Sequence, residues 1–311
     1  MTAFLGIRSR RGAYAALVVL TLIWGSNWLV MKGALAHADP VVFNLQRTWL
    51  AVAFLFAVIL WQRRLSWPDR WTPVVVTGLC TMVNFGTTTM ALAEGGAGRT
   101  SVLVFTMPFW TLLIARVVLH ERVRGVMWAS VGLAFAGLTV VVEPWHWQGQ
   151  LASKLWAIAS GLGWAGATVA TKYYQRKHDL DMLSFIAWQI LVGVLPLTLL
   201  LLLFDYPATR WTVGFVAELV YSGVVSTAFG FLLWIAILRH LPAGTASLNI
   251  FAIPVIALAS STLLAGERLT ANEWAGIAAI AAGLATLAAV TLRSVRRGEG
   301  GAPPPTPLEG G

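Results

Sequence analysis

Charged residues are scarce in this sequence. They make up 11% of its 311 residues, whereas a soluble globular domain carries roughly 25%. Hydrophobic residues make up 58%, which is more apolar surface than a soluble fold of this size buries. Lipid must therefore cover part of the folded chain, and the sequence predicts an all-α membrane protein.

Residues that carry enzymatic or metal chemistry are also few. Cys80 is the only cysteine, which excludes an internal disulfide and a cysteine-based metal cluster. The five histidines are dispersed in predicted loops, and no GxxxxGK[ST] phosphate-binding run is present. A GxGxxG run begins at Gly161, but it lies inside an apolar segment and follows no predicted strand. We therefore expect no catalytic residue, no metal and no cofactor, and we do not expect an enzyme.

Acidic residues are fewer than basic ones, and the formal net charge is +9. The basic residues lie in short loops and tails, not on one face, so we expect no nucleic-acid partner. With the N-terminus in the cytoplasm, 15 of the 22 basic residues fall at cytoplasmic ends and 5 at the opposite ends. This bias predicts a multi-pass protein of the inner membrane with both termini in the cytoplasm.

Ten apolar segments have the length of about 20 residues that a membrane-spanning helix requires. They cover residues 13–33, 41–61, 72–93, 98–118, 126–143, 153–173, 182–204, 216–238, 244–264 and 274–292. The tail, residues 298–311, is rich in glycine and proline and is expected to be disordered.

The sequence contains an internal repeat. Shifted by 146 residues, the segment 98–140 aligns without a gap on 244–286. The matched positions include Pro108 with Pro254, Glu121-Arg122 with Glu267-Arg268, and Trp128 with Trp274. We therefore expect two repeats, 13–143 and 153–292, each with five spans. Because five is odd, the second repeat must be inverted in the membrane, as in many transporters that work by alternating access.

Several of these residues resemble a known family. Trp24-Gly25-Ser26-Asn27, followed by Lys32 and by Arg47 in the second span, is similar to the first EamA-type repeat of the drug/metabolite transporter superfamily. The resemblance implies a ten-helix bacterial inner-membrane permease, often an exporter of amino acids or related metabolites. It also implies a central cavity lined by the first, third and fourth helices of each repeat. The second repeat departs from the pattern, with Ala165-Gly166-Ala167 in place of Gly25-Ser26-Asn27.

Polar and aromatic residues inside the spans are the candidate binding residues, because polar groups facing lipid are costly. The predicted substrate-binding residues are Trp24, Asn27, Asn84, Thr88, Thr106, Trp110, Trp164, Thr168, Phe229 and Asn249. Asn27 has a second interpretation, a hydrogen bond between helices. Pro108 and Pro254 are expected to kink their helices and to serve in gating. Glu121-Arg122 and Glu267-Arg268 lie at helix ends, where we expect them to tie loops or gates.

Arg47 also allows two interpretations. It pairs with a solute carboxylate, or it has a structural role, snorkelling outwards or bonding loop carbonyls. We prefer the structural role.

The sequence thus predicts a secondary transporter whose partners are a small-molecule substrate and the lipid bilayer, and which acts as a monomer. An amino-acid or related metabolite exporter is the preferred function. Carriers of sugars, other metabolites or hydrophobic drugs are alternatives, and an intramembrane enzyme or a non-transporting membrane receptor is an alternative of another class. No acidic residue falls near a predicted mid-plane, which favours uniport or exchange.

Overall fold

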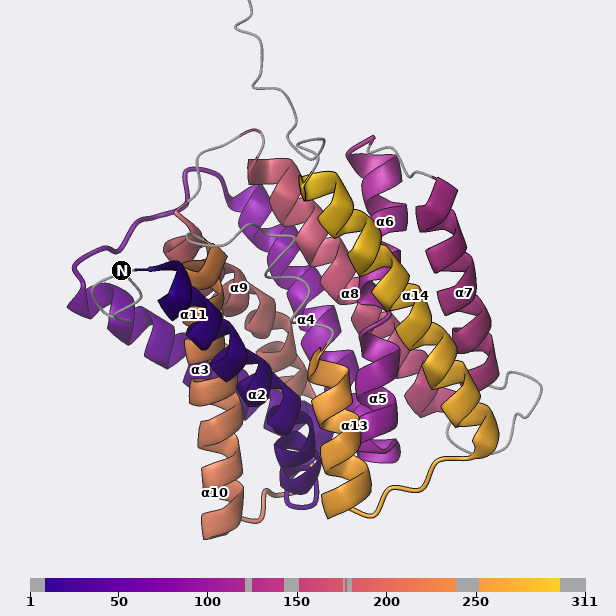
Figure 1. Cartoon of the computed structure of the whole chain (residues 1–311). Helices are drawn as coiled ribbons and strands as arrows, with labels where there is room; N and C mark the ends of the chain where they lie inside the picture. The colour runs from indigo at the N-terminus through magenta and orange to yellow at the C-terminus, as the bar shows by residue number, and fades with distance from the viewer. Residues whose placement is uncertain are drawn as a thin grey trace, which may run out of the picture.

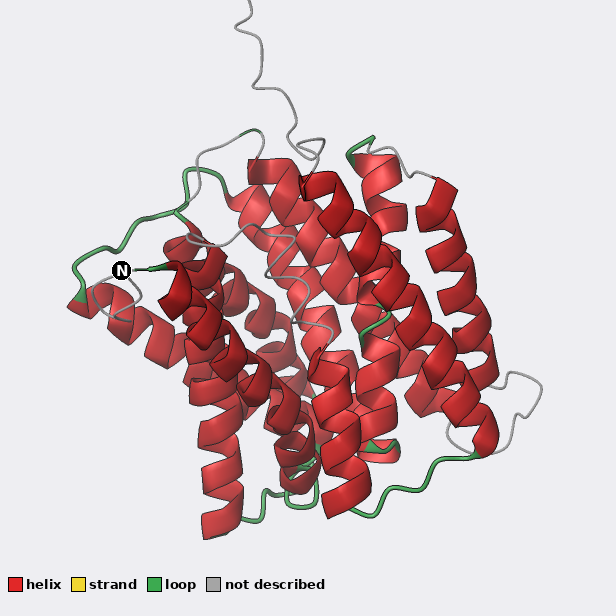
Figure 2. Ribbon diagram, viewed as in Figure 1, coloured by secondary structure: helices red, strands yellow, loops and turns green. Residues whose placement is uncertain are grey.

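The structure is a computed structural model that describes residues 9–120, 125–142, 151–175, 177, 181–238 and 252–296. The described part is helical and contains no strand (Figures 1 and 2). The first half of the chain forms α2 (Arg10–Ala34), α3 (Pro40–Trp61), α4 (Trp71–Glu94), α5 (Ala97–Val104), α6 (Met107–Val118) and α7 (Gly125–Val142).

The second half begins with α8 (Leu151–Gln175) and α9 (Met182–Leu203). A continuous run of helix follows, made of α10 (Val213–Val220), the π-helix η1 (Tyr221–Phe229) and α11 (Gly230–Leu238). The last described helices are α13 (Ala252–Leu264) and α14 (Ala271–Arg296). Each of the ten predicted segments therefore overlaps a helix. The predicted tail, residues 298–311, lies outside the described residues.

Six of these helical segments are long and apolar enough to cross a membrane. They are Arg11–Ala34, Pro40–Trp61, Trp71–Glu94, Ala97–Val118, Met182–Leu203 and Val213–Trp234. Gly125–Val141 and Ile253–Leu264 are apolar but shorter. The chain is thus a multi-pass membrane protein by its helices, while the count of ten spans stays a prediction.

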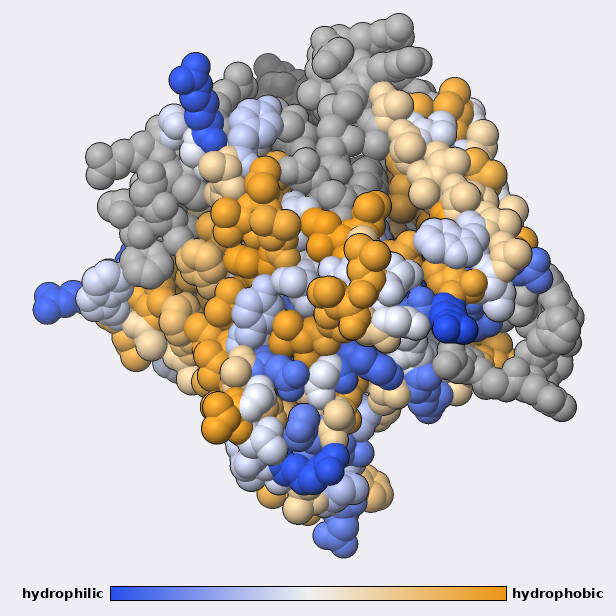
Figure 3. Space-filling view, turned by 60° about the horizontal axis from the view of Figure 1, so that its bottom comes forward, coloured by the Kyte–Doolittle hydropathy of each residue, from blue (hydrophilic) through white to orange (hydrophobic). Residues whose placement is uncertain are grey.

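Aspartates begin two of the helices where the sequence predicted breaks. The Asp39 side chain accepts a hydrogen bond of 2.8 Å from the amide of Val41, and Pro40 follows it at the first helical position. Asp181 begins α9 in the same way. Large apolar side chains remain on the surface, such as Val213 with 90% of its area exposed and Leu202 with 78%. Figure 3 shows such apolar residues spread across one face, as expected of a surface that lipid covers.

The first helices of the two repeats run in opposite directions. Near the end of α2, Lys32 donates to the Leu92 carbonyl of α4 at 2.6 Å. Near the start of α8, Ser153 donates to the Ala91 carbonyl at 2.7 Å. The end of α2 and the start of α8 therefore lie at the same end of α4. Because the repeat aligns α2 with α8, this is the arrangement that inversion requires.

The fifth helix of each half, α7 and α14, cross at close range and lie side by side in Figure 1. A Cβ atom on Gly137 would lie only 2.6 Å from the Gly276 carbonyl oxygen, and one on Gly283 would lie 2.9 Å from that of Ser130. The shift of 146 residues that defines the repeat converts one contact into the other. The crossing is therefore symmetric between the halves, and it depends on small residues.

Replacing Gly137 with leucine is expected to separate α7 from α14, because the backbone of Gly276 leaves no space for a side chain. We expect the free energy of unfolding to fall by about 2 kcal/mol or more. The thermal unfolding midpoint in detergent measures it. Gly132→Leu on the same helix is the control, since a Cβ there meets nothing within 4 Å. Equal midpoints for the two variants would contradict the proposed crossing.

The structure describes both prolines that were expected to kink their helices. The span 98–118 is interrupted, since α5 ends at Val104 and α6 begins at Met107. Pro108 is the second residue of α6, where its missing amide hydrogen costs no helical bond. Pro108 therefore lies at the break in the span and not inside a continuous helix, and its part in bending and gating stays a prediction. Pro254 is buried in α13, whose described part begins at Ala252, and its role in gating stays a prediction. The sequence also missed Pro196, which lies inside α9.

Candidate functional site

A cavity of about 110 Å³ lies between the two halves of the molecule. Helices of both halves line it. The lining side chains come from α2 to α6 in the first half and from α8, η1 and α11 in the second. The lining residues are Trp24, Asn27, Trp28, Met31, Arg47, Asn84, Phe85, Thr88, Val104, Phe105, Met107, Trp164, Ser226, Thr227 and Phe231. The cavity therefore combines aromatic walls with a few polar groups, as binding sites for small molecules do.

Five of the predicted binding residues line this cavity. They are Trp24, Asn27, Asn84, Thr88 and Trp164. Trp24 and Trp164, which a shift of 140 residues aligns between the repeats, meet edge to face with ring centroids 6.3 Å apart. Phe231 stacks on Trp164 at 6.4 Å, which completes an aromatic wall.

The run Trp24 to Asn27 fastens α2 to the π-helix η1. The Trp24 indole N–H donates to the Ser226 carbonyl at 2.9 Å. Two hydrogen bonds between side chains add to this. The hydroxyls of Ser26 and Tyr221 are 2.7 Å apart, and the Ser222 hydroxyl donates to Asn27 Oδ1 at 2.9 Å. Asn27 thus fills the interhelical role and also lines the cavity. No described residue accepts a hydrogen bond from its Nδ2.

Asn84 and Thr88 belong to a polar cluster that joins α4 to α8. Asn84 Nδ2 donates to the Ser160 hydroxyl at 2.8 Å and to its carbonyl at 3.0 Å. The hydroxyls of Thr88 and Ser160 are 2.6 Å apart. All three side chains are buried, so their hydrogen bonds satisfy polar groups that water does not reach.

Four other predicted residues lie away from the cavity. The Trp110 indole N–H donates to the Thr106 hydroxyl at 3.1 Å, and both residues line a small hollow beside Phe135. Thr168 is exposed, and its hydroxyl bonds the carbonyl of Trp164. Phe229 packs with Leu17, Leu20 and their neighbours. Asn249 falls outside the described residues.

The sequence missed several lining residues, and only some carried a signal. Arg47 is 4% exposed and faces the cavity, so the predicted snorkelling is wrong. Its charge inside a span was itself a signal of function. Ser226, Thr227 and Phe231 reach the cavity because η1 is a π-helix, whose wider turns change which side chains share a face. The sequence prediction had selected Phe229 in this span instead.

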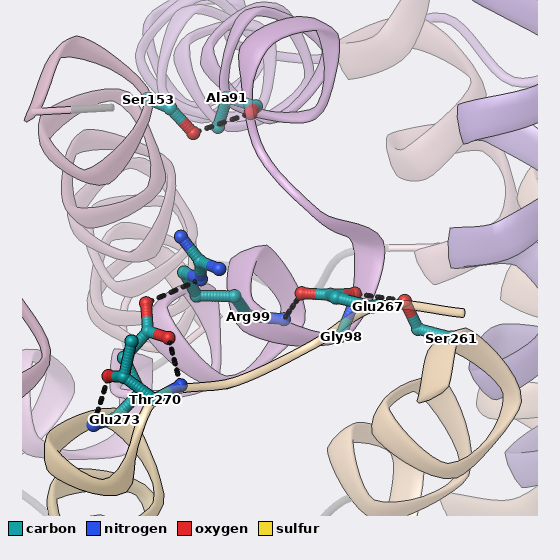
Figure 4. A network of polar contacts seen from close by, with 8 residues as sticks. All are labelled: Ala91, Gly98, Arg99, Ser153, Ser261, Glu267, Thr270 and Glu273. Carbon is teal, nitrogen blue, oxygen red and sulfur yellow. Dashed lines mark hydrogen bonds and ion pairs between the residues drawn. The ribbon is translucent and has the colours of Figure 1, made fainter. Parts of the chain in front are cut away.

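One end of the molecule is tied between the halves by Glu267 (Figure 4). Its carboxylate accepts hydrogen bonds from the amides of Gly98 at 2.9 Å and Arg99 at 3.1 Å, and from the Ser261 hydroxyl. It therefore caps the start of α5 from the other half. The Arg99 side chain pairs with Glu273 at 2.8 Å. The predicted tie at Glu267 is present, while its repeat counterpart Glu121 lies outside the described residues.

Comparison with known proteins shows which protein family the chain is similar to. The EamA-like transporter family matches residues 11–143 and 151–289. The transporter YoaV of Bacillus subtilis is 28% identical, over 86% of this chain and 94% of its own. A probable amino-acid metabolite efflux pump of Salmonella typhimurium is 29% identical, over 89% of this chain and 94% of the pump. A crystal structure at 20% identity superposes with a TM-score of 0.64, covering 92% and 99% of the two chains. The two sequence relatives are named as a transporter and an efflux pump and not as enzymes. This chain belongs to the EamA-like transporter family.

Proposed function

We propose that this protein is a secondary transporter that moves an amino acid or a related metabolite out of a bacterial cell across the inner membrane. The observation that carries the proposal is the cavity between the halves, where paired tryptophans meet the amides of Asn27 and Asn84. Aromatic faces with a few fixed polar groups suit a small amphipathic solute. The name of the Salmonella relative, a probable amino-acid metabolite efflux pump, agrees with this class.

The transport cycle is alternating access by two inverted five-helix repeats, residues 13–143 and 153–292. The antiparallel course of α2 and α8 and the symmetric crossing of α7 with α14 support this scheme. In the described conformation Glu267 ties α5 to the α13–α14 connection. We infer that this end faces away from the cytoplasm, with both termini on the cytoplasmic side, and that the tie opens for release.

The coupling mode follows from the charges around the cavity. Its lining contains no carboxylate among the described residues. Carriers driven by protons or sodium often use such a group, so we propose uniport or exchange. A strong acceleration of transport by an imposed pH gradient in proteoliposomes would contradict this mode.

Counterflow of labelled amino acids in proteoliposomes tests the function. We expect Trp164→Ala and Asn27→Ala to lower the rate about tenfold or more, because both residues line the cavity. Trp156→Ala is the matched control on α8, since Trp156 is 42% exposed and does not line the cavity. Exchange of sugars or hydrophobic drugs, and of no amino acid, would replace the proposed solute class and leave the family assignment intact.

A further inference from the structure

Arg47 is a buried cation in the wall of the cavity. It belongs to α3, and 4% of its area is exposed. The guanidinium group stays charged at physiological pH. The transport cycle proposed above gives this charge no role, yet burying a charge is strongly unfavourable unless an opposite charge is near. Its surroundings therefore indicate what the cavity receives.

The protein groups around Arg47 are all neutral. Its Nε donates to Asn44 Oδ1 at 3.0 Å, and its Nη1 lies 3.1 Å from the sulfur of Met31. The guanidinium carbon lies 4.7 Å from the ring centroid of Phe85, in a cation–π contact. No described residue accepts a hydrogen bond from Nη2. These contacts hold the side chain in place but do not neutralise it.

No counter-charge is found along the cavity. None of its described lining residues is acidic. At the tied end, the carboxylates of Glu267 and Glu273 are engaged with α5 and Arg99. Among the described lining residues, an anion that enters the cavity thus meets an arginine and no carboxylate.

We propose that Arg47 binds the carboxylate of the transported solute, and that the solute class is carboxylates with an apolar or aromatic group. This inference rests on the proposed transport function and narrows it. Arginine presents paired N–H groups that match a carboxylate, and Asn27 Nδ2 is a further donor in the same cavity. The apolar group lies against Trp24 and Trp164.

The same charges make the amino group dispensable. An ammonium group would find amide and hydroxyl oxygens in the described lining, but no carboxylate. Solutes without that group, such as α-keto acids and N-acylated amino acids, should therefore bind at least as well as the amino acids. Replacing the carboxylate by a neutral amide should remove the interaction with Arg47, because the guanidinium group then has no anion to pair with.

Ligand-induced thermal stabilisation of the purified full chain tests this. The probes are phenylalanine, N-acetylphenylalanine, phenylpyruvate and phenylalaninamide, with the matched set built on leucine. We expect all acids to raise the unfolding midpoint and to bind at least tenfold more tightly than the amides. Equal stabilisation by acids and amides, or none by any acid, would overturn the proposal. Binding of N-acyl and keto acids without counterflow of any amino acid would refute the amino-acid assignment alone.

Variants of Arg47 test whether this residue causes the preference for acids over amides. Arg47→Gln is expected to reduce the preference for acid over amide about tenfold or more, and Arg47→Lys to retain part of it. Arg116→Gln is the control, since Arg116 also lies over an aromatic ring in a predicted span, 5.9 Å from the Trp128 centroid, but is exposed. An unchanged preference in Arg47→Gln would contradict the assignment. If that variant does not fold, Arg47→Lys and the probe set on the wild type decide.

Discussion

Replacing Glu267 with alanine is expected to open the tied end of the molecule. Reagents added on that side should then reach the cavity. The carboxylate accepts hydrogen bonds from two amides of α5 and from Ser261. Charge-assisted bonds contribute roughly 1.5–3 kcal/mol each. A loss of about 3 kcal/mol in the tied conformation shifts a two-state equilibrium by roughly 100-fold, which makes this one of the largest effects that the structure predicts.

Labelling of a single cysteine measures the opening. Cys80 is the only native cysteine, so Cys80→Ser provides a background in which Val104→Cys reports on the cavity. Val104 lines the cavity on α5 and is 4% exposed. We expect a membrane-impermeant maleimide, added to spheroplasts, to label this cysteine at least tenfold faster when Glu267→Ala is present.

Two further variants show whether the charge of Glu267 is responsible. Glu267→Gln keeps one acceptor oxygen and should give an intermediate rate. Glu94→Ala removes an exposed carboxylate from the same end of the molecule, at the end of α4, and should leave the rate unchanged. If Glu94→Ala accelerates labelling as much as Glu267→Ala does, surface charge and not the tie controls access.

Replacing Trp24 with alanine is expected to destabilise the protein and to abolish transport together. Trp24 contacts the rings of Trp164, Phe231 and Trp234, and its N–H bonds the carbonyl of Ser226. Truncating a large packed aromatic side chain costs about 3–5 kcal/mol. We expect a lower unfolding midpoint in detergent, and counterflow that falls to the background of empty vesicles.

Phenylalanine at position 24 separates the ring from the hydrogen bond. Trp24→Phe keeps an aromatic ring but leaves the Ser226 carbonyl of η1 without the indole donor, a loss of about 1 kcal/mol. Its unfolding midpoint should therefore lie between those of the wild type and Trp24→Ala. Trp211→Ala, at a side chain 63% exposed, is the control and should change neither quantity. An unaltered midpoint in Trp24→Ala would show that the aromatic wall contributes no stability.

The sequence predicted the helical segments well because apolar length and inverted symmetry are properties of whole segments. The aspartate caps at Asp39 and Asp181 fell at predicted breaks, since capping is a local interaction. The tie at Glu267 was also anticipated from its place at a helix end. The individual binding residues depend instead on which way a helix turns, and small departures from a regular helix change that.

Two such departures explain the missed residues. Trp110 follows the interruption between Val104 and Met107, and it lines the hollow beside Phe135 and not the cavity. The π-helix η1 brings Phe231 to the cavity and leaves Phe229 against α2. The π-helix has no sequence signature that distinguishes it from ordinary helix, whereas Pro108 stands in the sequence at the interruption. Arg47 differs, because its charge was visible, but only the structure shows that its neighbours are neutral.

The symmetric crossing of α7 and α14 implies that some contacts persist during transport while others must break. If the halves exchange their conformations, the contact of Gly137 with Gly276 and that of Gly283 with Ser130 simply trade places. The pair of helices looks the same before and after, so it does not need to break at any stage. Glu267 is different, because its bonds to α5 belong to one end of the molecule. The α7–α14 contact would then stay intact throughout the transport cycle. The contacts that break and form would be those at the two ends of the molecule, such as the bonds of Glu267.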